Sequence, residues 1–291
     1  MMKTVSPISN QHQYSRRVAA LSFVLLLGAA NVSHADDASP WDNDQRSALR
    51  LVAGSAGVDM PVLRAGIEMH IDSGWKTYWR YAGDSGLPPT FDFAGSENVK
   101  SVTVLWPAPR RFPDGAGGNS IGYTGDIVFP LQIVTQDPSK PVTLRLKADY
   151  GVCEKICIPA SGKAQLQISG DQSAENTALA SAELRVPRKA ALGDPGPLSI
   201  RALHRETSVS GQRVTIDVRA PDGNGVDLFA EGPTPQWSLP LPEPVESGPG
   251  GTRRFAFDVD GVPPGSTIAG AEIKLTLVAG DRAIEVTAHL D

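Results

Sequence analysis

The feature that most constrains this chain is a series of short segments in which apolar and polar residues alternate between turn-forming residues. In the segment 142–150, for example, Leu144, Leu146 and Ala148 alternate with polar or charged residues. A period of two places successive side chains on opposite faces of a β-strand. The first half of the chain carries eight such segments at roughly ten-residue spacing, which is typical of a β-sandwich. They are 47–53, 62–71, 76–81, 90–93, 99–106, 127–135, 142–150 and 164–168.

A second set of alternating segments follows a break in the pattern. Residues 171–182 are polar with a helical tendency, and residues 192–197 (LGDPGP) have the composition of a linker. Strand patterns then resume at 198–204, 213–219, 226–230, 253–259, 272–279 and 283–290. We therefore expect an all-β protein with a sandwich domain at 40–170, a linker at 171–197 and a second, smaller sandwich at 198–291.

The first 35 residues have the pattern of a secretory signal peptide. Arg16 and Arg17 precede an apolar stretch at 18–30, and Ser33-His34-Ala35 forms a small-x-small cleavage site. We therefore expect export to the periplasm. No later segment approaches 18 consecutive apolar residues, so we expect no stable membrane insertion.

Removal of the leader leaves an acidic chain. The only charged residues it takes away are Lys3, Arg16 and Arg17, so 24 basic and 32 acidic residues remain, a net charge of −8. An acidic surface argues against nucleic acid or anionic lipid as a partner. No serine-protease triad order, phosphate-binding glycine loop or metalloprotease helix stands out, and the histidines are scattered.

Two cysteines, Cys153 and Cys157, are the visible chemistry of the chain. They lie between the segments 142–150 and 164–168, which places them in a connection or at a hairpin end. In an oxidising compartment, two thiols this close are expected to form a disulfide, provided that their α-carbons lie about 4.4–6.8 Å apart.

Three roles are open for this pair. Closing a loop of about five residues removes only about 2 kcal/mol of unfolded-state entropy, whereas a staple between distant strands would remove more. Short disulfides in turns are also more easily reduced, so redox exchange is the favoured interpretation. A plain staple stays open, and so does a copper(I) site, because Cys-x3-Cys thiolates suit that soft ion. Met69 or His70 would then supply a further ligand.

The order of several motifs resembles the N-terminal periplasmic domain of the DsbD thiol:disulfide interchange family, and most closely its copper-tolerance variant, ScsB. The resemblance covers roughly residues 45–170. It rests on the motifs Gly74-Trp75-Lys76-Thr77-Tyr78-Trp79-Arg80, Gly83-Asp84-Ser85-Gly86-Leu87-Pro88, Trp106-Pro107, Tyr123, Gly151-Val152-Cys153 and Cys157-Ile158-Pro159.

The resemblance implies immunoglobulin-like sandwiches with one reversible disulfide and no cofactor. Cys157 would form the mixed disulfide with partners, and Cys153 would resolve it. A loop at about 111–118 would cap the disulfide through Phe112, and Tyr78 would line the pocket. The implied partners are thioredoxin-like periplasmic proteins and a membrane reductase. The chain shows neither a membrane conduit nor a thioredoxin-like domain, so we expect the reductase to act in trans.

The cysteine spacing departs from the common family pattern. Three residues separate Cys153 from Cys157, where that pattern has five.

Overall fold

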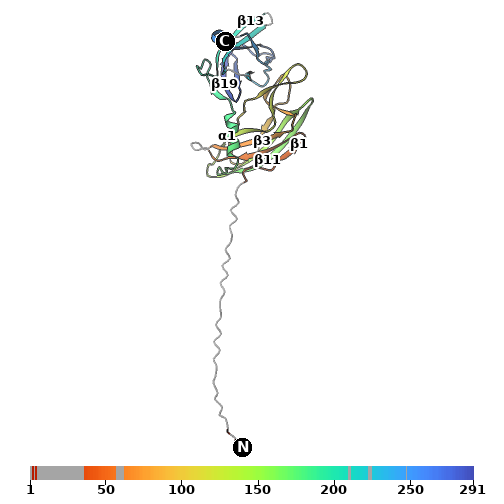
Figure 1. Cartoon of the computed structure of the whole chain (residues 1–291), viewed down its shortest axis with the longest axis vertical. Coiled ribbons are helices and arrows are strands. Elements are labelled where there is room, and N and C mark those ends of the chain that lie inside the picture. The colour runs from red at the N-terminus through yellow and green to blue at the C-terminus, as the bar shows by residue number, and fades with distance from the viewer. Residues whose placement is uncertain are drawn as a thin grey trace. The chain divides into compact units, whose positions relative to one another are not determined.

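The computed structural model describes residues 2, 4, 36–56, 62–208, 211–221, 225–246 and 248–291. The expected signal peptide at 1–35 therefore lies outside the described residues, apart from Met2 and Thr4. Within the described ranges the regular secondary structure is nearly all strand, with the single α-helix α1 (Asn176–Leu184) and a 3₁₀ turn at Pro249–Gly251 (Figure 1). The predicted all-β class is confirmed.

Two sheets form what we call the first sandwich. One sheet has the order β1 (Asp42–Asp44), β2 (Ser47–Ala53), β3 (Val62–Ile71), β9 (Ile127–Thr135) and β6 (Val99–Val104). The other has the order β11 (Cys157–Ile168), β10 (Val142–Cys153), β4 (Lys76–Gly83), β8 (Asn119–Thr124) and β7 (Arg110–Pro113), with β5 (Thr90–Asp92) paired to β10. Side chains from both sheets, such as Phe129 and Trp79, share one buried core.

Two further sheets form the second sandwich. One has the order β12 (Arg188–Ala190), β19 (Arg282–His289), β18 (Glu272–Ala279) and β15 (Val226–Glu231). The other has the order β13 (Ser199–Ser208), β14 (Gly211–Arg219), β17 (Arg253–Asp258) and β16 (Glu243–Val245). Their inward residues, such as Ile216 and Leu275, form a separate core.

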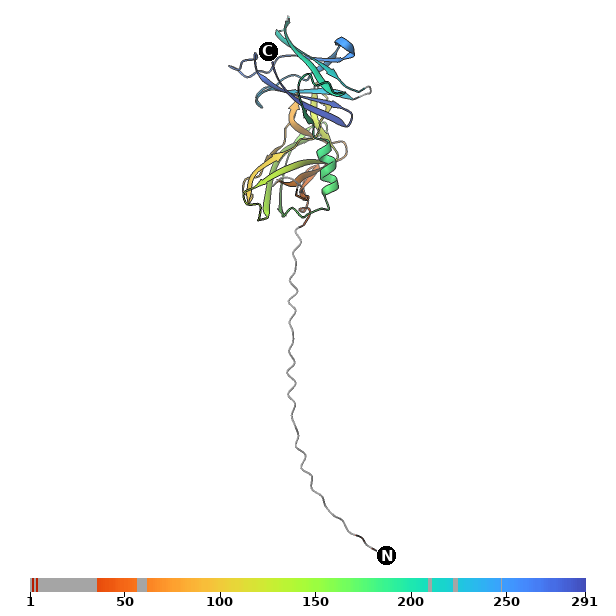
Figure 2. The ribbon, with the colours of Figure 1, turned by 90° about the vertical axis from the view of Figure 1, so that its left-hand side faces the viewer.

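The segment expected as a linker, 171–197, contains regular structure. Helix α1 packs against β3 and β9 of the first sandwich, along one side of it in Figure 2. Leu179 of α1 is fully buried, and a β-carbon added to Gly66 of β3 would lie 2.8 Å from Leu179 Cδ2. The helix therefore packs closely on the sheet. Strand β12 then pairs in parallel with β19 of the second sandwich. No helix in the described ranges has the length and apolar character to cross a bilayer.

The structure differs from the predicted strands at several places, including the short strands β1, β12 and β16, which were not predicted. Strands β2, β3, β9 and β18 have the predicted bounds. The short strands β7 and β8 were not predicted, because the Arg110–Pro113 segment has no apolar alternation and the segment Asn119–Thr124 is buried almost throughout. The expected loop at 111–118 is therefore shorter, and Phe112 lies on β7, paired with Ser120 on β8.

Candidate functional site

The hairpin of β10 and β11 brings the two cysteines together. Its ladder runs without interruption from Val142↔Ile168 to Cys153↔Cys157, the last pair before a three-residue turn. The two α-carbons are 4.2 Å apart, and the sulfurs form a disulfide. Both strands extend to the cysteines, beyond the predicted ends at 150 and 164. Burial of the Val152 side chain stabilises the extended end of β10. The end of the hairpin is therefore part of the sheet.

The two cysteines differ in their exposure to solvent. Cys153 is 2 % exposed and packs with Tyr78 and Ala82 in a small buried cluster. Cys157 is exposed, and Ile156 beside it in the turn is 70 % exposed. A thiol from another molecule can therefore reach Cys157 and is kept from Cys153.

Strand β4 places a phenol hydroxyl on the disulfide. Its first residues pair with the end of β10, as Lys76↔Cys153 and Thr77↔Val152. The next residue, Tyr78, is 1 % exposed, and its hydroxyl lies 2.5 Å from Cys153 Sγ and 2.9 Å from Cys157 Sγ. This hydroxyl has one proton, so it donates to one sulfur at a time.

Two glycines leave room for the Tyr78 ring. A β-carbon on Gly86 would lie 2.2 Å from Tyr78 Cε1, and one on Gly151 would lie 3.1 Å from Tyr78 Cε2. Gly86 also has a φ of +142°, a backbone conformation that residues with a side chain rarely adopt. The Gly151 amide donates to the Leu87 carbonyl at 3.2 Å, which ties the 86–87 segment to β10. The sequence motif contained these residues, but their role as a slot for the ring required the structure.

Burial and a nearby carboxylate keep the Tyr78 hydroxyl protonated. Burial raises the pKa of Tyr78 above its ordinary value, and the nearby Asp114 carboxylate raises it further. Burial lowers the pKa of Lys76, an effect that Asp114 partly opposes. Tyr78 therefore remains a hydrogen-bond donor throughout the pH range in which thiols exchange.

Phe112 occupies a neighbouring position in the same sheet. Lys76 Nζ lies 5.8 Å from the centre of the Phe112 ring and donates a hydrogen bond to the Pro113 carbonyl at 3.2 Å. The buried side chains packed on Cys153 are Tyr78 and Ala82. The structure thus brings Tyr78, Cys153 and Cys157 together and places Phe112 against Lys76.

The side chains suggested as further copper ligands have other surroundings. Met69 is fully buried in the core of the first sandwich, a cluster that does not include Cys153. His70 Nδ1 lies 2.6 Å from Asp126 Oδ1. Within the described ranges, no three His, Cys, Asp or Glu side chains are grouped so that they could hold a metal ion.

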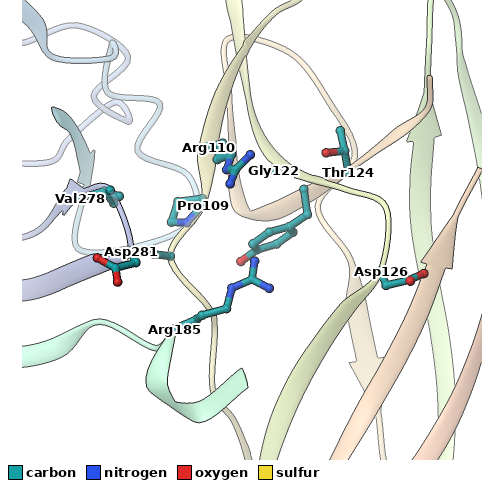
Figure 3. Close-up of a pocket in the computed structure, with 11 residues that line it drawn as sticks. Pro109, Arg110, Gly122, Thr124, Asp126, Arg185, Val278 and Asp281 are labelled. Carbon is teal, nitrogen blue, oxygen red and sulfur yellow. The ribbon is translucent and has the colours of Figure 1, made fainter. Parts of the chain in front are cut away.

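A cavity of about 350 Å³ lies apart from the cysteines, lined by residues of both sandwiches and by Arg185 after α1. Figure 3 shows the Arg185 side chain extending into it, while the carboxylates of Asp126 and Asp281 lie on opposite sides. Neither cysteine lines this cavity, so we place the candidate site at the hairpin end.

Comparison with known proteins gives the family of this region. Residues 57–169 match the family described as thiol:disulfide interchange protein DsbD, N-terminal. This range contains both cysteines, Tyr78 and Phe112. The region is a DsbD-type N-terminal domain. No curated protein matches the sequence.

A solved structure resembles the DsbD-type domain together with the second sandwich. The N-terminal periplasmic domain of ScsB from Proteus mirabilis has a TM-score of 0.66 and 20 % sequence identity. The match covers 87 % of this chain and 98 % of the other. At this identity the likeness concerns the fold, which is immunoglobulin-like and extends past the DsbD-type domain.

Proposed function

We propose that this protein is a periplasmic thiol–disulfide exchange protein that passes electrons between a reductase and periplasmic thiol proteins. The observation that carries the proposal is the asymmetry of the disulfide. Cys157 is exposed, whereas Cys153 is buried under a hydroxyl that can stabilise it as a thiolate. A staple inside a core would need neither feature.

The first step is reduction of the disulfide. A thiolate of the reductant attacks Cys157 Sγ, the bond between the two protein sulfurs breaks, and Cys153 Sγ leaves with the electron pair. The Tyr78 hydroxyl donates a hydrogen bond to this thiolate. Because hydrogen bonds to charged acceptors are stronger than neutral ones, Tyr78 makes Cys153 a better leaving group.

The remaining steps complete the electron transfer. A second thiolate of the reductant attacks its own sulfur in the mixed disulfide and releases Cys157, so two electrons enter this protein and the reductant becomes a disulfide. Cys157 then attacks the disulfide of a partner protein. Cys153 displaces the reduced partner from Cys157 and restores the starting disulfide. The roles assigned to Cys153 and Cys157 follow from their exposure and agree with those implied by the family resemblance.

The partners follow from this chemistry. The reductant must present two thiols, as a thioredoxin-like protein does, and we propose that a membrane reductase supplies its electrons in trans. We place the protein in the periplasm because of the signal-peptide pattern at 1–35, and the similar ScsB domain is periplasmic by its description. We also propose that Phe112, with Lys76, shields the disulfide from small oxidants.

Trapping tests the proposal. In Cys153→Ser the exposed Cys157 thiol remains without its resolving partner, so mixed disulfides with periplasmic thioredoxin-like proteins should accumulate. The matched control is Cys157→Ser, whose remaining thiol is buried and should trap little. Wild-type disulfide should also be opened by a thioredoxin poised at about −270 mV.

Two results would contradict the proposal. One is equal trapping by the two variants. The other is a native disulfide that thioredoxin leaves intact in the folded protein.

A further inference from the structure

The pairing of the strand that carries Tyr78 is interrupted directly after this residue. Strand β4 pairs with β8 at Lys76, Thr77 and Tyr78, and the register then shifts until Gly83. Its pairing with β10 covers only Lys76 and Thr77. In the described part of the sheet, residues 79–82 therefore have no register partner. Contacts from outside the sheet can therefore help to fix this part of the strand.

The second sandwich supplies those contacts. Arg80 donates to both carboxylate oxygens of Glu231, at 2.8 and 2.6 Å, and to Glu285 at 2.5 Å. The centres of the Trp79 and Phe229 rings are 5.8 Å apart. Phe229 lies on β15 of the second sandwich, but its side chain is buried in the core of the first. The neighbouring Tyr81 hydroxyl donates to the Leu239 carbonyl.

These ion pairs are shielded from solvent. The side chain of Glu285 is 6 % exposed, that of Glu231 is 15 % exposed and that of Arg80 is 24 % exposed. Burial by itself raises the pKa of Glu285, but hydrogen bonds from Lys189 and Arg80 outweigh it, so this pKa is lowered. Glu285 thus remains charged, and the cluster resists screening by salt.

The neighbouring edge strand is held in the same way. Arg111, next to Phe112 on β7, donates to both carboxylate oxygens of Asp227, at 3.1 and 2.8 Å. It also donates to Glu243 and to the Pro242 carbonyl. Both strands that carry the aromatic residues of the site are therefore fixed to the second sandwich.

We propose that the second sandwich is a positioning part of the thiol site, in which Glu231 and Glu285 act through Arg80 to hold the Tyr78 hydroxyl on the sulfurs. This inference rests on the proposed function, because it assigns a role in disulfide exchange. Without the two glutamates, residues 79–82 lose their charged anchor, and the hydroxyl no longer stays within hydrogen-bonding distance of Cys153.

The test measures the rate at which reduced glutathione opens the disulfide at fixed pH. Glu231→Gln/Glu285→Gln should slow this reaction at least threefold, and Glu231→Gln alone should slow it less. The matched control is Glu183→Gln, which removes a two-point ion pair with Arg64 (2.9 and 2.8 Å) between α1 and β3. This control should react at the wild-type rate.

A double-mutant cycle separates positioning from general loosening. Tyr78→Phe already lacks the hydroxyl, so adding the two glutamine substitutions to it should slow the reaction no further. The inference is overturned if folded Glu231→Gln/Glu285→Gln reacts at the wild-type rate, or if its effect adds fully to that of Tyr78→Phe. If the double variant does not fold, the cycle with Glu231→Gln alone decides. A wild-type disulfide that glutathione and thioredoxin both leave intact would instead refute the proposed function.

Discussion

Replacing Tyr78 by phenylalanine isolates the contribution of one hydroxyl to disulfide exchange. The ring stays in the slot formed by Gly86 and Gly151, while the hydrogen bond to Cys153 Sγ, 2.5 Å in length, is lost. During reduction this sulfur becomes a thiolate, and a hydrogen bond to a charged group contributes about 1.5–3 kcal/mol. The hydroxyl is shared between two sulfurs, so we take the lower value. It corresponds to a rate about tenfold lower.

The assay follows opening of the disulfide by excess reduced glutathione, with free thiols alkylated at timed intervals and counted by mass. Tyr150→Phe is the matched control. Its hydroxyl lies on β10 but bonds to Ser47 Oγ at 2.8 Å, so its loss should leave the rate unchanged. The pKa of Tyr78 is raised above its ordinary value, so its hydroxyl stays protonated between about pH 7 and 9. The ratio of the wild-type rate to the Tyr78→Phe rate should therefore stay constant over this range. Equal rates for wild type and Tyr78→Phe would refute the assigned role of the hydroxyl.

Three further predictions concern the site and the core. Gly86→Ala places a methyl group 2.2 Å from the Tyr78 ring, so it should lower the melting temperature and slow reduction by glutathione as Tyr78→Phe does. Burial raises the pKa of Tyr123 well above its ordinary value, so the stability due to its neutral form is complete below about pH 10 and is lost as the pH rises through the folded-state pKa. Urea titrations between pH 9 and 11 should show a smaller loss of stability for Tyr123→Phe than for wild type. Replacing both Cys153 and Cys157 by serine should lower the free energy of unfolding by about 2 kcal/mol, and a loss above about 5 kcal/mol would show that the disulfide mainly stabilises the fold.

The alternation of apolar residues predicted much of the fold because it reflects a local property. Strands β3 and β9 place alternate side chains in the core, such as Ile67 and Met69 on β3 and Phe129 and Leu131 on β9, which is the period of the pleat. A period of two puts neighbouring residues such as Tyr78 and Trp79 on opposite faces of β4, and the two belong to different buried clusters. Strand β7 escaped prediction because its place is set by pairing with β8 and by contacts of Arg111 with the second sandwich.

The residues alone determined that the chain is a β protein with a cysteine pair between two strands, since strand period and cysteine spacing are local properties of the sequence. That the pair closes a hairpin was decided by the ladder of β10 and β11. Which cysteine is exposed, and which hydroxyl contacts the two sulfurs, was decided only by the tertiary structure. Cys153 and Tyr78 are 75 residues apart, and they meet because β4 pairs with the last residues of β10. The contacts of Glu231 and Glu285 with Arg80 could not be predicted from the sequence either. They join two sandwiches, and local sequence patterns carry no information about contacts between distant segments.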